Sequence, residues 1–89
     1  MNIQISKRFA KDTERINDPI ILAKIRTVLE NAKSVQSVSD IAGIKEMSGH
    51  PGFYRIKFDY RYRMGIYCEL DTVQFLRVGP RGDFYKKFP

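Results

Sequence analysis

The sequence predicts an α+β fold in which two helices pack on one face of a four-stranded antiparallel sheet. Four segments have the composition and alternation of strands, at residues 2–6, 53–59, 61–70 and 73–79. Between the first and the second of these, two stretches carry apolar residues at helical spacing. The expected order is therefore β-α-α-β-β-β, within one domain that covers residues 1–89.

A short strand and a helix open the predicted fold. Ile3 and Ile5 alternate with polar residues, as in a strand with one buried face. Ser6 can cap the first helix, because its hydroxyl can accept a hydrogen bond from a free N–H of the first turn. The inner side of this helix is expected to carry Phe9, Ala10, Thr13 and Ile16.

The second helix has clear signals both at its start and along its buried side. Asp18 is a good cap, and Pro19 suits the first helical position. Apolar residues then recur at helical spacing, at Ile21, Ile25, Val28, Leu29 and Ala32. Residues 34–52 are less regular, with a helical turn expected near Asp40 before a Gly-His-Pro-Gly break at 49–52.

The last three strands alternate apolar positions with basic or small ones. The apolar side of the first comprises Tyr54, Ile56 and Phe58. The apolar side of the second comprises Tyr62, Met64, Ile66, Cys68 and Leu70. A tight turn at Asp71 and Thr72 is expected to join the second strand to the third, which ends at Gly79-Pro80 and leaves a short tail.

Positive charge and aromatic residues are concentrated in the last part of the chain. The net charge is +6, which favours nucleic acid or an acidic partner. Residues 53–89 hold eight Lys or Arg against four acids and ten of the eleven aromatic residues, whereas residues 1–52 balance eight bases against six acids. The cations expected to share a strand face are Arg55 with Lys57, Arg61 with Arg63, and Arg77 with Arg81.

Several classes of function lack their residues in this sequence. One His and one Cys, far apart, do not make a zinc site, and no P-loop or GxGxxG motif is present. The single Cys68 excludes an intramolecular disulfide and indicates a reducing compartment, and no apolar stretch reaches the length of a membrane span. We expect a cytoplasmic protein with no cofactor, no metal and no membrane partner, in which His50 is structural or simply exposed.

The cations and one tyrosine allow phosphodiester chemistry. Cleavage by a neighbouring 2′-OH needs a base for that hydroxyl, stabilisation of charge on the non-bridging oxygens, and an acid for the leaving 5′-oxygen. Arg and Lys supply the second of these. Tyr85, four residues after Arg81 and followed by two lysines, is the candidate base, since neighbouring cations favour its phenolate. Taken alone, the residues favour a structural role, in which Phe84, Tyr85 and Phe88 hold the tail on the sheet.

Three segments resemble the RelE-type toxins of bacterial toxin–antitoxin systems. They are FYRIKF at 53–58, YRMGIY at 62–67 and DTVQFLRVGPRGDFYKKFP at 71–89. Members of that family carry Tyr-Arg strands and a closing Arg-x-x-x-Tyr followed by Phe, and the layout of their N-terminal half is similar. The resemblance implies a RelE-like fold, a cognate antitoxin as partner, and metal-independent cleavage of mRNA on the ribosome, which inhibits translation.

The resemblance also implies roles for five residues. Arg55 and Lys57 fall at the basic positions that bind the substrate phosphates. Arg63 matches the arginine that stabilises the transition state. Arg81 matches an arginine proposed to assist the leaving group, and Tyr85 matches a tyrosine proposed as the general base.

The chain departs from the family pattern at one position. Pro80 stands where many relatives carry His or Lys, so the proline supplies neither a proton nor a charge beside Arg81. Arg61 and Arg77 have no firm counterpart and are expected to contact the backbone or to remain solvated.

Two other functions are compatible with the same sequence. One is inhibition of DNA gyrase by binding, as in ParE-type relatives, which usually lack the terminal tyrosine and the complete set of cations. The presence of Tyr85 with Arg63 and Arg81 therefore favours the nuclease. The other is a non-catalytic RNA-binding module, which needs exposed aromatic residues beside the cations, whereas Phe58 and Tyr62 are expected in the core.

Overall fold

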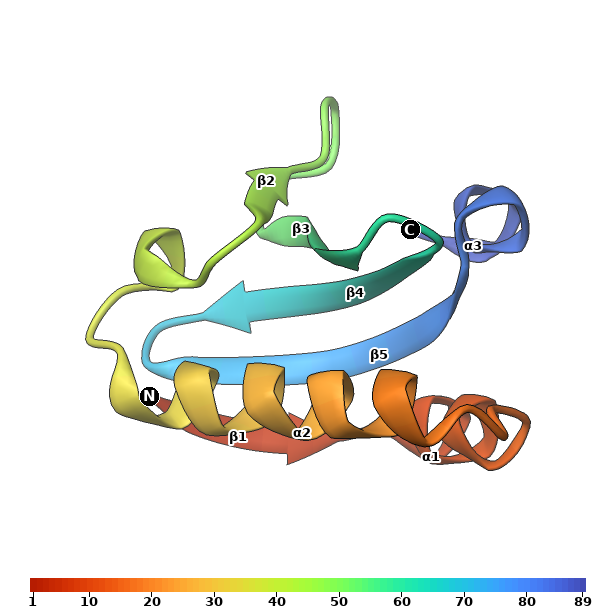
Figure 1. The fold of residues 1–89 in the computed structure, drawn as a ribbon. Helices are drawn as coiled ribbons and strands as arrows, with labels where there is room; N and C mark the ends of the chain where they lie inside the picture. Colours follow the sequence, from red (N-terminus) through yellow and green to blue (C-terminus); the bar gives the residue numbers. More distant parts are fainter.

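A mixed sheet of five strands forms the centre of the computed structural model, which describes residues 1–89 (Figure 1). The strands are β1 (Asn2–Ile5), β2 (Ile44–Glu46), β3 (Phe53–Asp59), β4 (Tyr62–Glu69) and β5 (Thr72–Pro80). The helices are α1 (Lys7–Glu14), α2 (Pro19–Ser34) and α3 (Arg81–Lys87), with a 3₁₀ turn, η1, at Val38–Asp40. Across the sheet the order is β1-β5-β4-β3-β2, with β1 parallel to β5 and all other neighbours antiparallel.

The α+β class is confirmed, but the predicted four-stranded antiparallel sheet is wrong in two respects. The sheet is mixed, because β1 pairs in parallel with β5 and places Ile3 beside Val73. It also has a fifth strand, β2, whose three residues are too few for an alternating pattern to be recognised. In addition the predicted C-terminal tail is helix α3, so the order is β-α-α-β-β-β-β-α.

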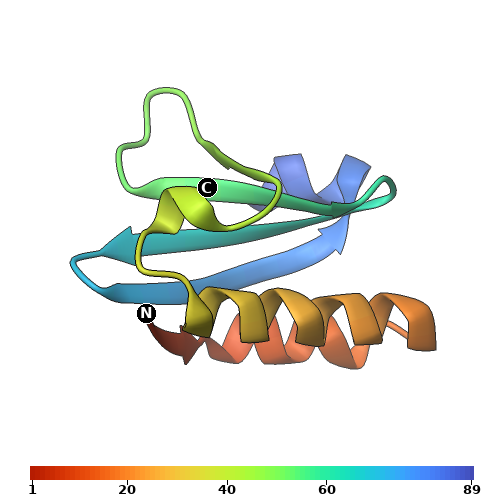
Figure 2. The same cartoon turned by 60° about the vertical axis from the view of Figure 1, so that its left-hand side comes forward.

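Helices α1 and α2 lie on one face of the sheet, as predicted, and α3 lies on the other (Figure 2). Both predicted caps are confirmed. The Ser6 hydroxyl accepts a hydrogen bond from the Phe9 N–H at 3.0 Å, and the Asp18 carboxylate accepts one from the Ile20 N–H at 2.9 Å. Each cap stabilises its helix by about 1 kcal/mol. None of the three helices combines the length and the apolar character needed to cross a membrane.

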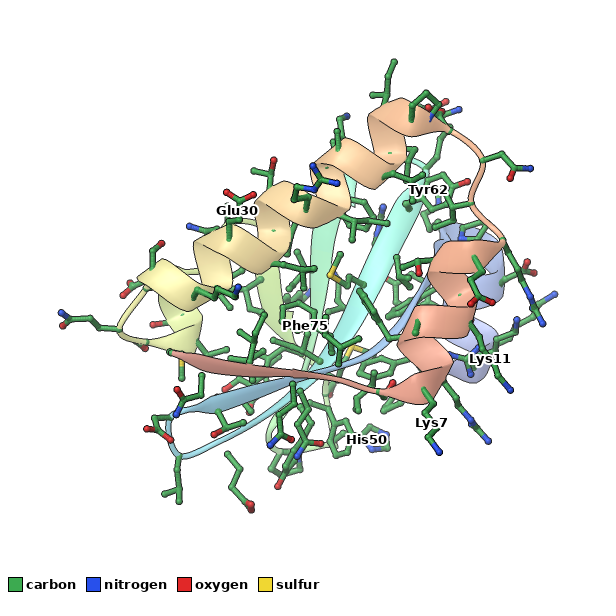
Figure 3. All side chains as sticks on the ribbon, turned by 90° about the horizontal axis from the view of Figure 1, so that it is seen from below. Lys7, Lys11, Glu30, His50, Tyr62 and Phe75 are labelled. Atoms are coloured by element: carbon green, nitrogen blue, oxygen red, sulfur yellow. The ribbon has the colours of Figure 1, made fainter.

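The core lies between the sheet and these two helices. α2 buries its predicted side through Ile21, Ile25 and Ala32. Phe9 of α1 meets Phe75 of β5 edge-on, with ring centroids 5.6 Å apart, and Figure 3 shows Phe75 between the two helices. Burial of each such ring contributes about 1.5–3 kcal/mol, so this contact holds α1 against β5. The prediction for Ala10 is wrong: it is exposed, and Asp12 is buried instead.

The alternation predicted for β3 and β4 is confirmed except at the β4–β5 turn. Ile56, Met64 and Ile66 are completely buried, but Leu70 is 93% exposed and has a φ of 56°. The turn comprises Leu70 and Asp71, and Thr72 already belongs to β5. A side chain at positive φ is strained, so Leu70 is held there by the pairing of the strands on either side.

Candidate nucleic-acid interface and active site

Basic residues of three neighbouring strands lie together on the sheet face opposite α2. Lys57 pairs with Arg63 across β3 and β4, and Arg55 pairs with Gly65. On the other side of β3, Lys45 of β2 pairs with Arg55. Directly paired residues point to the same side of a sheet. The structure thus brings together three of the predicted site residues, and we call Lys45, Arg55, Lys57 and Arg63 the basic face.

Lys45 is a member of this face that the sequence prediction missed. Its strand consists of Ile44, Lys45 and Glu46 only, and it lies in the stretch that was expected to be irregular. The one available signal was this apolar–basic–acidic triplet. Pairing of β2 with β3 places the Lys45 side chain beside Arg55.

The side chain of Arg55 extends from β3 toward the loop that precedes β2. Its Nη1 donates to the carbonyl oxygen of Gly43 at 3.0 Å, and the backbone N–H of Lys57 donates to the same oxygen at 3.0 Å. Gly43 has a φ of 78°, and a Cβ at this position would clash with the carbonyl oxygen of Lys57. Only glycine lets the loop approach β3 this closely, so Gly43 helps to orient the side chain of Arg55. The side chain of Lys57 remains exposed.

Arg63 is buried, with 5% of its surface exposed. Its Nη1 lies 2.8–3.2 Å from the carbonyl oxygens of Asp59, Tyr60 and Tyr62, so the guanidinium closes the turn between β3 and β4. Its Nε and Nη2 donate no hydrogen bond within the protein. Every fully buried side-chain nitrogen of the protein has a hydrogen-bond partner, so these two nitrogens are not fully buried. These two groups therefore keep contact with solvent and can still bind an anion.

Arg61 does not share a face with Arg63, contrary to the prediction from strand parity. It lies in the turn beyond β3 and reaches toward the helices, 3.6 Å from the carboxylates of both Asp18 and Asp59. Asp59 also accepts a hydrogen bond from Lys24 at 2.8 Å. The hydrogen bond from Lys24 is the largest cause that lowers the pKa of the Asp59 carboxyl below its usual value, and the hydrogen bond from the backbone N–H of Arg61 is the second. Arg61 thus lies near two carboxylates of the helix side, while its side chain remains 55% exposed, as expected for a solvated charge.

Helix α3 packs on the basic face through two aromatic residues one turn apart. Phe84 and Phe88 are 2% and 5% exposed and stack on each other at 5.1 Å between ring centroids. Phe88 also lies 6.0 Å from the ring of Phe53. The side of Gly65 that faces away from the core is in contact with the Phe88 ring. The tail thus has the structural role predicted for Phe84 and Phe88, but as a helix.

The remaining predicted site residues, Arg81 and Tyr85, lie on α3. They are four residues apart, so they are neighbours on the helix surface, and both are exposed. The backbone N–H of Arg81 donates to the carbonyl of Arg61 at 2.8 Å, which places the start of α3 beside the β3–β4 turn. The side chain of Tyr85 is 47% exposed, and its ring meets that of Phe84 edge-on, so its hydroxyl is open to a ligand.

Arg77 is not a freely solvated charge, contrary to the prediction, but forms a partly buried ion pair. Its Nε and Nη2 donate to the two carboxylate oxygens of Asp12 at 2.9 and 3.1 Å. Asp12 also accepts a hydrogen bond from the Val78 N–H at 3.1 Å. The hydrogen bonds to Asp12 raise the pKa of Arg77 above its usual value. This pair ties α1 to β5 and removes Arg77 from the free cations.

His50 and Cys68 lie apart from the predicted catalytic residues. His50 is exposed and contacts Phe53 edge-on, with ring centroids 6.4 Å apart. Cys68 is partly buried against the core, and burial raises the pKa of its thiol. A protonated thiol facing the core fits the predicted role of Cys68 as a small apolar residue.

The sequence and the fold both match known toxins. A protein named Toxin RelE3, from Methanocaldococcus jannaschii, is 32% identical over 90 residues that cover all of both chains. The toxin of a RelB–RelE antitoxin–toxin complex from Methanococcus jannaschii is 30% identical, with a TM-score of 0.80 and coverage of 96% of this chain and 98% of the other. The chain therefore belongs to the RelE family of toxins, within the RelE/ParE superfamily. It is the toxin of a type II toxin–antitoxin system.

More distant structures share the fold alone. A chain of an archaeal RelE–RelB complex from Pyrococcus horikoshii superimposes with a TM-score of 0.73 at 14% identity, covering 93% of this chain and 97% of the other. A YoeB dimer from Staphylococcus aureus gives a TM-score of 0.70 at 18% identity, with coverage of 86% and 92%. No protein-family model matches the sequence.

Proposed function

We propose that this toxin is a metal-independent endoribonuclease that cleaves mRNA on the ribosome and so stops translation. One observation carries the proposal. The β3–β4 register puts Arg55, Lys57 and Arg63 on the face where α3 packs, and α3 presents Arg81 and Tyr85 to solvent. The five residues thus belong to three elements, β3, β4 and α3, that lie on or against the same face of the sheet.

The basic face supplies the binding of the phosphates. Arg55 and Lys57 neutralise the RNA backbone on either side of the scissile bond, and Lys45 extends the positive charge toward the edge of the sheet. Arg63 uses its free Nε and Nη2 to stabilise the charge that develops on the non-bridging oxygens. Because its Nη1 is held by the turn, the guanidinium is oriented before the substrate arrives.

The two residues of α3 carry the proton transfer and the leaving group. Tyr85 takes the proton of the 2′-OH, the 2′-oxygen attacks the phosphorus, and the bond from phosphorus to the 5′-oxygen breaks. The leaving 5′-oxygen takes up a proton from water, and the products are a 2′,3′-cyclic phosphate and a 5′-hydroxyl. Arg81, one helical turn from Tyr85, stabilises the charge on the leaving oxygen. Pro80, which ends β5, takes no part in the chemistry.

We infer that a cognate antitoxin binds this chain and masks or distorts the basic face. The RelB–RelE complex described above supports this proposal. The exposed apolar side chains of Ile5 and Ile20, at 50% and 66% exposure, lie outside the basic face and offer a partner further apolar contacts.

Tyr85→Phe is the test of the nuclease. The change removes one oxygen from an exposed ring, so the free energy of unfolding should change by less than about 1 kcal/mol. Cleavage of ribosome-bound mRNA, read by mapping of 5′ ends, should fall by about 10²-fold or more. Arg81→Ala should be similarly impaired, and the two losses should not add, because both residues serve one transition state.

Each alternative function predicts a different outcome of the same experiment. A gyrase inhibitor remains toxic as Tyr85→Phe, leaves transcripts intact and raises DNA-damage signalling. A non-catalytic RNA-binding module binds RNA equally well in parent and variant, and neither cuts. A folded Tyr85→Phe variant that cuts at the parental rate would overturn the assignment of the base.

A further inference from the structure

The turn between β3 and β4 holds the Arg63 side chain through three backbone carbonyl groups. Nη1 of its guanidinium lies 2.8, 3.2 and 2.9 Å from the carbonyl oxygens of Asp59, Tyr60 and Tyr62. These oxygens come from both sides of the chain reversal, so they converge on one nitrogen only while the turn keeps its shape. The direction in which Nε and Nη2 point therefore depends on the conformation of this turn.

The carboxylate of Asp59 fixes the conformation of the turn. Its Oδ1 accepts a hydrogen bond from the backbone N–H of Arg61 at 2.8 Å, the contact by which an Asp side chain closes a turn two residues further on. Its Oδ2 accepts one from Nζ of Lys24 at 2.8 Å, so α2 holds the same carboxylate. The Asp59 side chain is 9% exposed, and little water competes for these bonds. One oxygen thus serves the turn, and the other ties it to the helix layer.

A bulge in β3 turns Asp59 away from the basic face. Strand alternation alone would put Asp59 on the same side as Lys57. The register shifts between these two residues, however, because Lys57 pairs with Arg63, Asp59 pairs with Tyr62, and Phe58 between them has no partner in the ladder. Asp59 therefore shares the side of Tyr62 and α2. It cannot touch RNA bound on the basic face, so any effect on the reaction must pass through the turn.

We propose that Asp59 is a positioning residue for the cleavage reaction, whose carboxylate fixes the β3–β4 turn that orients the Arg63 guanidinium toward the scissile phosphate. Lys24 completes the arrangement from the opposite face of the sheet by holding the second carboxylate oxygen. This inference rests on the nuclease function proposed above. Helix α3 is also hydrogen-bonded to the turn, but its two buried phenylalanines hold it on the sheet independently. The effect of Asp59 should therefore be exerted mainly through Arg63.

Two substitutions of Asp59 separate its two hydrogen bonds. Asp59→Asn keeps an oxygen that can accept from the Arg61 N–H but loses the charge that binds Lys24, whereas Asp59→Ala loses both acceptors. Ser6→Ala is the stability control, because it removes the cap of α1 and touches no residue of the turn. Cleavage of ribosome-bound mRNA is measured over a range of ribosome concentrations, at a temperature where circular dichroism shows each variant to be folded.

The cleavage rate at saturation should fall by up to about 10²-fold in Asp59→Ala, the scale of a guanidinium displaced by about 1 Å. Asp59→Asn should lie between this variant and the parent. The ribosome concentration at half-maximal rate should not change, because Arg63 acts on the transition state and not on ribosome binding. Ser6→Ala should cut at the parental rate. A loss in Ser6→Ala equal to that in Asp59→Ala would reduce Asp59 to a stabilising residue and overturn the proposal.

A double-mutant cycle tests whether Asp59 acts through Arg63. In an Arg63→Met background, Asp59→Ala should lower the single-turnover rate by less than about 3-fold, because the group that it positions is absent. Arg55→Met provides the matched background, since Arg55 is an arginine of the same face that binds the carbonyl of Gly43, outside the turn. There Asp59→Ala should cost as much as in the parent. Additive losses in the Arg63→Met background would show that Asp59 acts by another route.

NMR of the Arg63 side chain measures the positioning without cleavage. Rotation about the Nε–Cζ bond should be slow in the parent and in Ser6→Ala, because Nη1 is held by the turn, and faster in Asp59→Ala. Should Asp59→Ala not fold, Asp59→Asn and Lys24→Met give the same comparison. Unchanged rotation in the Asp59 variants would overturn the proposal. If the parent never cuts mRNA, the nuclease proposal fails, and the rotation rates still decide whether Asp59 orients the guanidinium.

Discussion

The ring of Phe88 lies directly on Gly65 of β4, so that a Cβ at position 65 would come within 2.6 Å of it. Gly65 is in the centre of the sheet, next to Arg55 of the basic face. The missing side chain leaves room for α3, and α3 carries Arg81 and Tyr85. The position of the proposed catalytic pair therefore depends on a glycine in the neighbouring strand.

Gly65→Ala should push Phe88 and α3 off the sheet. Overpacking of this kind costs about 1–3 kcal/mol, and we expect cleavage to fall together with stability. Urea unfolding and hydrogen exchange of the α3 amides measure the two effects. Gly79→Ala is the matched control, because nothing lies within 4 Å of a Cβ there. Equal behaviour of the two variants would show that the contact does not position α3.

Replacement of Arg63 should affect both stability and cleavage, whereas replacement of Lys57 should affect cleavage only. Arg63→Met leaves the carbonyl oxygens of the β3–β4 turn without their donor, which should cost about 1–3 kcal/mol in unfolding free energy. Lys57 is exposed and makes no side-chain hydrogen bond, so Lys57→Gln should unfold like the parent and bind RNA more weakly. An Arg63→Met variant of parental stability would contradict the structural half of this assignment.

Asp12→Ala should be the most destabilising change of a charged residue. It leaves the guanidinium of Arg77 without its carboxylate and the Val78 N–H without its acceptor. Loss of one partner of a fully buried pair costs about 3–5 kcal/mol, and the loss here should be smaller because the Arg77 side chain is 17% exposed. Asp83→Ala, which removes an exposed carboxylate on the same side of the molecule, should change the midpoint of thermal unfolding very little.

Leu70→Gly should stabilise the protein, although Leu is the more apolar residue. The leucine is 93% exposed, so it contributes no packing, and its φ of 56° is one that glycine adopts without strain. We expect a gain of up to about 1 kcal/mol in urea unfolding. Ile20→Gly, at an exposed position of α2 with ordinary helical backbone, should instead be destabilising.

The ion pairs of Asp59 should make stability sensitive to acid. The folded-state pKa of Asp59 is lowered by Lys24 and Arg61, so this contribution is fully present above the pKa of about 3.9 in the unfolded chain. The stabilising contribution of Asp59 is lost as the pH falls from the unfolded-state pKa through the lower folded-state pKa. Unfolding free energies of parent and Asp59→Asn should therefore converge below about pH 4. A difference that stays constant from pH 6 to about pH 2 would rule out this linkage.

Local signals account for the parts of the fold that were predicted correctly. Ser6 and Asp18 cap the helices because their side chains bond to N–H groups two or three residues away. Arg55 and Lys57 share a face because strand side chains alternate. Such properties depend on neighbours in the sequence, and they do not change with the rest of the chain.

Long-range contacts account for the errors. β1 pairs with a strand about 70 residues away, and no local pattern shows whether that pairing is parallel. Arg61 and Arg77 were both expected within strands, yet one reaches toward Asp18 and the other toward Asp12. The seven residues of α3 are too few to show a helical period, and its helix is held by burial of Phe84 and Phe88.

By itself, then, the sequence determined the α+β class, the capped helices, the parity of Arg55 with Lys57 and the residues of the resemblance, because each depends on local spacing or identity. Only the tertiary structure decided that Lys45 joins these cations, that Arg63 is built into a turn, and that α3 lies on Gly65. Those facts depend on strand register and on contacts between residues distant in the chain, and register is set by how the whole sheet packs.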